Sequence, residues 1–398
     1  MTPNKQFYFP LASDNWDSEE IESILSVIKS NKFTMGEEVK NFEKNMSSYL
    51  GSKYSVMVNS GSSANLLMLT ALKILLSQNK IRKGNIIVPA VSWSTTFTPA
   101  YYLGLELRFC DIDRDHFGLN FENVEKAITN DTVAILAVNL LGSPSDLVRL
   151  KKLAAERNII LLEDNCESLG AKLDGKFTGT FGLMGSNSSF YSHHINSMEG
   201  GWVTTDSYEM WEILSSLRTH GWTRQLDLTS KWRKKNVETE WFDSQFEFVL
   251  PGLNFRPIEM EGAIASVQLK KLDKMLTVRR NNAKLLIEAL QNNDFVRLQN
   301  PLGDSSWFSF ALIFPSTEIR NTIARKFKLA NIECRPVVTG NFTRQPVMEF
   351  LDHTIADDLY YSNLIHDCGM YIGNHPHPLN SELDRVVEII SNTKNYEL

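Results

Sequence analysis

The sequence predicts an α/β protein in which helices sandwich a mostly parallel sheet and a smaller α+β domain follows. Three observations support this fold class. Short apolar runs alternate with amphipathic segments through the N-terminal part of the chain, as in repeated strand–helix–strand units. Polar, turn-forming clusters follow several of these runs, as they do at the ligand-binding edge of a parallel sheet. From about Pro257 the pattern changes to a long helix and a shorter mixed segment. We therefore expect a large domain at 1–256 and a small domain at 257–398.

The first predicted elements are two amphipathic helices, at 18–30 and 37–50, in which apolar residues recur with the period of a helix. The runs that follow supply the sheet and its covering helices, with strands expected at 54–60, 85–91, 105–113, 132–140 and 158–165 and helices at 62–76 and 145–157. Another short β-prone run, 188–194, ends in two adjacent histidines. Residues 225–250 mix charged and aromatic side chains without a clear period, and a long helix covers 258–290.

Composition and charge exclude several classes of protein. A net charge of -6 argues against non-specific nucleic-acid binding, which requires a basic surface. No apolar run approaches the roughly 20 residues that span a bilayer, and the first residues lack a signal-peptide pattern. The four cysteines, Cys110, Cys166, Cys334 and Cys368, are scattered and suggest neither a disulfide framework nor a zinc site. We expect a cytoplasmic protein with no nucleic-acid or membrane partner and no bound metal.

Three of the polar clusters that follow strands could bind a ligand. Gly61 and Ser62 lie in "NSGSSAN", where the N-terminus of a helix could hold a phosphate or where a serine could simply cap the helix. Trp93 follows the next strand and could stack on a flat ligand or fill the core. Asp164 and Glu167 follow the strand at 158–165, where a carboxylate could pair with a protonated ring nitrogen, cap a helix or bind a metal. A metal is disfavoured because no histidine follows at ligand spacing.

Together, a phosphate cradle, an aromatic plate and a buried acid describe a binding site for pyridoxal phosphate. The chain resembles the DegT-type nucleotide-sugar aminotransferase family of fold-type-I pyridoxal-phosphate proteins. The resemblance extends over nearly the whole chain, through the segments "KFTMGEEVKNFEK", "VNSGSSANLLML", "IIVPAVSWSTTF", "LLEDNCESLGA", "GTFGLMG", "RTHGW" and "GLNFRPIEMEGAIASVQL". It implies a homodimer with shared active sites.

The same resemblance implies roles for individual residues. Trp93 would stack on the cofactor ring, and Asp164 would pair with the ring nitrogen. Gly61, Ser62 and Ser189 would hold the phosphate group. Asn254, in the "NFRP" segment, would reach that phosphate from the partner subunit.

One position departs from the family pattern. Family aminotransferases carry a lysine that binds the cofactor covalently, followed by a run that ends in "GEGG". Here the run is "SHHINSMEGG", and His194 stands at the lysine position. An imidazole cannot form that covalent link, but it can transfer protons near neutral pH. Glu167 is a second departure, because the aminotransferases usually carry glutamine there and the position borders the cofactor.

These departures resemble a branch of the family, the nucleotide-sugar 3-dehydratases, which remove a hydroxyl group instead of adding an amino group. The resemblance implies a GDP-linked substrate, GDP-4-keto-6-deoxy-D-mannose, and a 4-keto-3,6-dideoxy product for dideoxysugar (O-antigen) biosynthesis. It also implies non-covalent pyridoxal or pyridoxamine phosphate, L-glutamate as amino donor and no iron–sulfur cluster. By the same resemblance His220, Arg256 and Glu333 would contact the substrate.

Two alternatives stay open from the sequence. The protein could be a nucleotide-sugar 4-aminotransferase that recruits another base, or a family member without catalytic activity. Release of ammonia would favour the dehydratase, and formation of an amino sugar would favour the aminotransferase.

Overall fold

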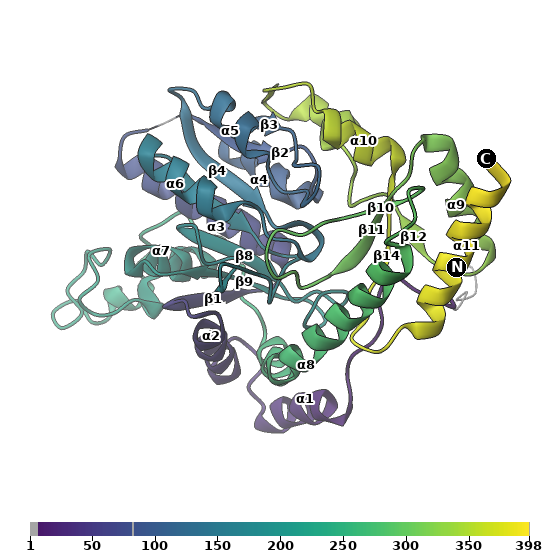
Figure 1. Ribbon diagram of the computed structural model, residues 1–398. Helices are drawn as coiled ribbons and strands as arrows, with labels where there is room; N and C mark the ends of the chain where they lie inside the picture. Colours follow the sequence, from purple (N-terminus) through teal and green to yellow (C-terminus); the bar gives the residue numbers. More distant parts are fainter. Residues whose placement is uncertain (1–6, 82, 398) are drawn as a thin grey trace.

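The computed structural model describes residues 7–81 and 83–397 and is shown in Figure 1. It begins with the two predicted helices, α1 (Ser18–Ser30) and α2 (Glu37–Leu50). Asp17 and Glu20 form a capping box at the start of α1, and the left-handed residues Asn31 (φ 56°) and Gly51 (φ 69°) end α1 and α2. Both helix predictions are confirmed.

An eight-stranded sheet forms the centre of the large domain, with the strand order β1-β9-β8-β5-β4-β2-β3-β13. Its strands are β1 (Tyr54–Val58), β2 (Asn85–Pro89), β3 (Glu106–Cys110), β4 (Thr132–Val138), β5 (Ile160–Asp164), β8 (Met184–Ser188), β9 (Gly201–Thr205) and β13 (His353–Ile355). Strand β9 is antiparallel to both of its neighbours, and all other pairings are parallel. The predicted fold class, a mostly parallel sheet covered by helices, is confirmed.

Helices cover both faces of this sheet (Figure 1). They are α3 (Gly61–Gln78), α4 (Ser94–Leu103), α5 (Phe121–Ala127), α6 (Leu147–Arg157) and α7 (Tyr208–Arg218). Neighbouring residues of a strand enter opposite cores: Leu162 packs with the cluster under α3, α4 and α7, whereas Leu161 packs with the cluster under α5 and α6. Asp164 therefore lies on the α3 side of the sheet, and Glu163 lies on the α6 side.

The second core is built around the long helix α8 (Glu259–Leu290) and a four-stranded antiparallel sheet of order β10-β11-β14-β12. The strands are β10 (Arg297–Leu298), β11 (Ser309–Ile313), β12 (Cys334–Arg335) and β14 (Gly369–Gly373), and the helices are α9 (Thr317–Leu329), α10 (Tyr360–Cys368) and α11 (Asn380–Glu397). Strand β13 leaves this region and pairs with β3 at the edge of the large sheet. The division at residues 256 and 257 stays a prediction.

Two further features differ from the predictions or add to them. Strand β8 ends at Ser188, so the adjacent histidines lie in the loop that follows and not at the end of a strand. The hydroxyl-rich sequence after Ser188 folds back on itself, with the N–H of Ser189 donating to the carbonyl oxygen of Gly200 (3.0 Å). A two-stranded ribbon of β6 (Lys172–Leu173) and β7 (Lys176–Phe177) lies beside the sheet.

None of the helices in the described part of the chain combines the length and apolar character needed to cross a bilayer.

Candidate functional site

The first turn of α3 lies at the edge of the large sheet and has backbone N–H groups that could bind an anion. Ser60 caps the helix, its hydroxyl accepting the N–H of Ser63 (3.0 Å), which leaves the N–H groups of Gly61 and Ser62 for an anion. A side chain at Gly61 would meet Ser188, since an added Cβ would lie 2.6 Å from the Ser188 Cβ. An added Cβ at Gly201 would lie 2.7 Å from the nitrogen of Gly61. Small residues therefore let three backbone segments meet at one point, as a phosphate cradle requires.

Asp164 lies at the end of β5, beneath this cradle, and is 5% exposed. Asn65 Nδ2 (2.9 Å) and Thr96 Oγ1 (2.7 Å) both donate to Asp164 Oδ2. Oδ1 accepts the N–H of Cys166 (3.2 Å), and a carboxylate oxygen can accept more than one hydrogen bond, so it can also accept from a cationic donor. A buried carboxylate held in this way is suited to pair with a protonated ring nitrogen.

Trp93 precedes the first residue of α4, and its side chain is 57% exposed. The hydroxyls of Ser62 and Thr95 lie 2.9 Å apart, which brings the N-termini of α3 and α4 together. Trp93 is therefore close to the cradle and is not core filler, which leaves its ring available for stacking.

Asn65, Thr96 and Ser188 were not predicted as site residues. Asn65 lies one helical turn after Gly61, the first residue of α3, and Thr96 lies in the first turn of α4. Both side chains could therefore have been found from the predicted starts of these helices. Ser188 is the serine that faces Gly61, whereas the Ser189 hydroxyl lies 2.6 Å from that of Ser197. The phosphate role of Ser189 stays a prediction.

His194 is 1% exposed and lies in the loop after β8. Its Nε2 lies 3.2 Å from the carbonyl oxygen of Ser306, and its Nδ1 is buried without a hydrogen-bond partner in the described part of the chain. Burial, reinforced by the nearby Arg279 guanidinium, lowers the pKa of His194 well below its usual range. The imidazole is therefore neutral at pH 7 and available as a base.

His193 is half-buried beside His194 and packs against Phe190 and Phe308, with ring centroids at 6.0 Å and 5.2 Å. Burial lowers the pKa of His193 to about 4. Its contacts are those of a packed aromatic side chain.

Glu167 anchors the loop after β4. One of its carboxylate oxygens accepts the N–H of Leu141 (3.0 Å), a residue in the left-handed region (φ 54°). Burial raises the pKa of Glu167 to about 7, and the negative charge of Asp164 contributes to this shift. Glu167 lies three residues after Asp164, the ring-pairing candidate, but its carboxylate bonds to a different segment.

Glu167→Gln is expected to change the pH dependence of stability. Because the folded protein holds the Glu167 proton more tightly than the unfolded chain, this residue costs the wild type stability as pH rises from about 4.5 through 7. Glutamine keeps an acceptor for Leu141 but does not titrate. Urea unfolding of both proteins without cofactor should show the variant gaining about 2 kcal/mol relative to wild type between pH 5 and pH 8. If the free energies of unfolding of the variant and the wild type differed by the same amount at pH 5 and at pH 8, the raised pKa of Glu167 would be wrong.

The predicted substrate-binding residues, His220, Arg256 and Glu333, fall into two separate places, and Asn254, predicted to contact the cofactor phosphate, lies with the first two. His220 and Asn254 come together because the N–H of His220 donates to the Leu253 carbonyl oxygen (2.8 Å), and Asn254 Oδ1 accepts from the Arg256 guanidinium (3.0 Å). All three side chains are exposed. Glu333 lies beside the small sheet, where it accepts from the Leu11 N–H (3.0 Å). In the described part of a single subunit, no hydrogen bond joins any of these residues to His194.

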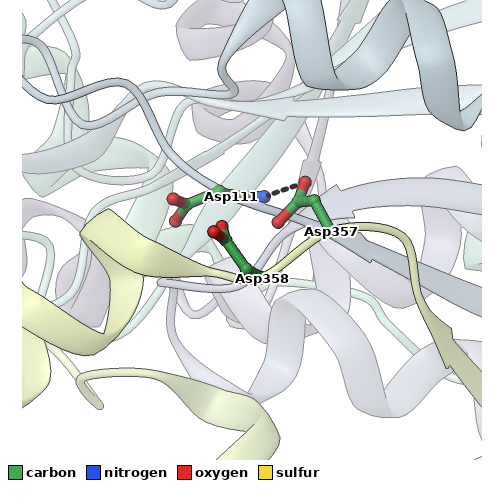
Figure 2. Close-up of side chains that lie close together, drawn as sticks. All are labelled: Asp111, Asp357 and Asp358. Carbon is green, nitrogen blue, oxygen red and sulfur yellow. Dashed lines mark hydrogen bonds between the residues drawn. The ribbon is translucent and has the colours of Figure 1, made fainter.

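Figure 2 shows a second group of carboxylates, Asp111, Asp357 and Asp358. Asp111 accepts the N–H groups of Tyr361 and Ser362, both at 2.7 Å, at the start of α10. Asp357 accepts the N–H of Asp111 at 3.0 Å. These backbone contacts make the group a helix cap that ties α10 to the end of β3.

The residues around the cradle fit pyridoxal phosphate. The free N–H groups of α3 match a phosphate monoester, the spare acceptor capacity of Asp164 matches a pyridinium N–H, and the exposed Trp93 ring matches a flat heterocycle. The orphaned Nδ1 of His194 supplies the buried base that proton transfer requires. No lysine lies between Ser188 and Gly201.

Known proteins match this chain over nearly its whole length. A sequence model of the DegT/DnrJ/EryC1/StrS aminotransferase family matches residues 14–391. GDP-4-keto-6-deoxy-D-mannose 3-dehydratase of Yersinia pseudotuberculosis is 47% identical over 387 residues, which cover 96% of this chain and 98% of that protein. A solved structure of E. coli GDP-4-keto-6-deoxy-D-mannose-3-dehydratase with bound hydrated PLP has a TM-score of 0.92 at 45% identity and covers 97% of this chain and 100% of its own. Another structure of such an enzyme, with a trapped PLP-glutamate geminal diamine, has a TM-score of 0.91 at 44% identity and covers 96% of this chain and 100% of its own.

Proposed function

The chain belongs to the DegT/DnrJ/EryC1/StrS aminotransferase family, and from this premise we propose that it is a lyase that removes the C3 hydroxyl group of GDP-4-keto-6-deoxy-D-mannose. The observation that carries the proposal is His194: a histidine occupies the lysine position of a cofactor site whose other parts are in place. The similarity to GDP-4-keto-6-deoxy-D-mannose 3-dehydratases at 44–47% identity supports the same function.

The cofactor is pyridoxal phosphate, converted to its amine form by L-glutamate and held without a covalent bond. When bound, it supplies an electron sink that stabilises negative charge next to the sugar ketone. We assign the phosphate group to Gly61, Ser62 and Ser189, the ring face to Trp93 and the ring nitrogen to Asp164. We add Asn65 and Thr96 as the residues that hold Asp164 in place. We place Glu167 beside these cofactor-binding residues, where it holds the loop after β4 through the N–H of Leu141.

His194 carries the proton transfers. Because burial lowers its pKa, the ring is neutral at pH 7 with a free lone pair that can take the proton, and the imidazolium that results is a stronger acid than usual. That acid is suited to protonate the departing C3 oxygen, which leaves as water. A lysine at this position would instead bind the cofactor covalently and favour amination at C4.

The net reaction balances without another reductant. The sugar exchanges its C3 hydroxyl for hydrogen, and glutamate becomes 2-oxoglutarate and ammonia, so glutamate supplies the two electrons. Incubation with the GDP-linked ketosugar and glutamate in heavy water should place deuterium at C3, consume glutamate and release ammonia, as followed by mass spectrometry. A 4-amino product that keeps oxygen at C3 would establish aminotransfer and refute the proposal.

We also propose that the protein works as a homodimer with shared active sites. The segment 225–250, here the aromatic arm, extends beyond α7 in Figure 1. It exposes large apolar side chains next to Asn254: Trp241 (64%), Phe242 (70%), Phe246 (68%) and Phe248 (55%). Large apolar side chains exposed on one segment favour burial against a second copy. The exposed Asn254, His220 and Arg256 would then complete the partner's site, with Glu333 contributing from the small sheet.

Asn254→Ala is expected to weaken the binding of pyridoxal phosphate about tenfold to a hundredfold, because a hydrogen bond to a charged phosphate is lost. Its melting temperature should stay within about 2 °C of wild type, since the Asn254 side chain is exposed. Cofactor titration by absorbance and thermal unfolding would measure these two properties, and sedimentation would measure the oligomeric state, with Asn300→Ala as a control on the small domain. A fully active monomer, or equal cofactor retention in the two variants, would refute the role across the interface.

The remaining assignments follow from the same function. We propose a cytoplasmic location, where the nucleotide sugar and glutamate are available. We also propose that residues 1–256 bind the cofactor and that residues 257–398 form the small domain.

A further inference from the structure

The two nitrogens of His194 have different surroundings. Nε2 faces the carbonyl oxygen of Ser306 (3.2 Å), and Nδ1 has no partner among the described residues. A carbonyl oxygen can only accept a hydrogen bond, so Nε2 must carry the hydrogen. A neutral imidazole has a single N–H, and Nδ1 therefore carries the free lone pair.

We propose, on the basis of the function proposed above, that residues 305–308 fix the Nε2–H tautomer of His194 and so make Nδ1 the proton-accepting atom. Gly142 is the positioning residue of this arrangement, because it lets that loop approach. The inference assigns one atom to the proton transfer and links the base to a loop of the small domain.

The Ser306 carbonyl group is held by contacts to the loop after β4. The N–H of Ser306 (2.9 Å) and the Ser305 hydroxyl (2.8 Å) both donate to the carbonyl oxygen of Gly142. The N–H of Phe308 donates to the Leu141 carbonyl oxygen (3.2 Å). Glu167 binds Leu141 from the other side, so it anchors the segment on which the 305–308 loop rests.

Gly142 is required at this junction for two reasons. Its φ of +93° is strained for a residue with a side chain. An added Cβ would also lie 2.6 Å from the nitrogen of Phe308 and close to that of Trp307. A methyl group at 142 must therefore displace the 305–308 loop, and with it the Ser306 oxygen that faces His194.

Two arginines of α8 hold the same loop from the opposite side. Arg280 Nε donates to the Ser305 carbonyl oxygen (3.0 Å), and Arg279 donates to that of Phe308 (3.1 Å). Their positive charges also disfavour a second proton on His194. The surroundings therefore maintain one neutral form of the ring.

The test is nitrogen NMR of full-length protein labelled with ¹⁵N in its histidine rings, recorded before and after addition of pyridoxal phosphate. His194→Asn identifies the signals. The wild type should show a protonated Nε2 and a bare Nδ1 at His194. Gly142→Ala should give a mixture of both tautomers and a kcat at least tenfold lower, with the KM for the sugar within about twofold. Gly175→Ala is the matched control, since Gly175 has a φ of +77° but no atom within 4 Å of an added Cβ.

Three results would overturn the inference: a protonated Nδ1 in the wild type, a pure Nε2–H tautomer in Gly142→Ala, or a mixture in Gly175→Ala. If Gly142→Ala does not fold, Ser305→Ala removes one of the two donors to the Gly142 carbonyl and should shift the tautomer ratio in the same direction. An unchanged ratio there would count against the proposal. Because the spectrum is read without turnover, formation of an amino sugar would refute the proposed function and leave the tautomer assignment standing.

Discussion

His194→Asn should lower kcat by about two to four orders of magnitude, the range over which a positioned acid–base group accelerates proton transfer. An amide of similar size can fill part of the ring's space, but it cannot accept and return a proton at neutral pH. The KM for the sugar should change little, because the loss falls on the transition state. Single-turnover kinetics with the amine form of the cofactor would measure the effect directly.

His193→Asn provides the matched control, because the two histidines are adjacent in the chain and His193 is half-buried beside His194. His193 packs on Phe190 and Phe308, so its replacement should lower the melting temperature while kcat stays within about threefold. Equal losses of kcat in the two variants would show that the pair acts together. More than a tenth of wild-type activity in His194→Asn would refute its role as the base.

Asp164→Asn should lower kcat by about a hundredfold or more while the fold is kept. Asparagine has the shape of aspartate and can still accept from Thr96, but it carries no negative charge to keep the ring nitrogen protonated. The electron sink of the cofactor is then lost. The absorbance spectrum of the bound cofactor gives a readout of ring protonation that does not depend on turnover.

Glu163→Gln is the control for this variant, because Glu163 is the preceding residue and points to the other face of β5. Its carboxylate accepts the N–H groups of Gly179 (2.6 Å), Phe181 (2.6 Å) and Gly182 (2.9 Å). Replacing it should cost about 2–3 kcal/mol of stability and leave the cofactor spectrum unchanged. If Glu163→Gln altered the cofactor spectrum and Asp164→Asn did not, the carboxylate that pairs with the ring nitrogen would be Glu163, and the proposal for Asp164 would be wrong.

The large sheet and the edge that carries the site could be predicted from the sequence. Parallel strands end at one edge, so clusters after separate strands had to meet, and Asp164 does contact α3 and α4 there. The face of the sheet on which Asp164 lies also follows from the sequence. Side chains alternate along a strand, so Asp164 lies on the same face as Leu162, two residues earlier in β5. Asn65 could have been found by counting one helical turn from Gly61.

The surroundings of His194 could not be predicted in this way. Ser306 lies 112 residues further along the chain, and its contact with His194 runs through a backbone carbonyl that any residue could supply. The end of β8 was also misplaced, because the β-prone aromatic residues after Ser188 suggested that the strand continued. Hydrogen bonds between Ser189, Ser197 and Gly200 turn the chain instead.

The pairing of β13 with β3 bears on the order in which the protein can fold during synthesis. His353, Thr354 and Ile355 pair with Leu107, Arg108 and Phe109, so the edge of β3 stays uncovered until the ribosome has made nearly the whole chain. An uncovered strand edge is a template for pairing between chains. Nascent chains that stall before residue 353 should therefore be prone to aggregation, and a fragment that ends at residue 256 should inherit the same exposed edge.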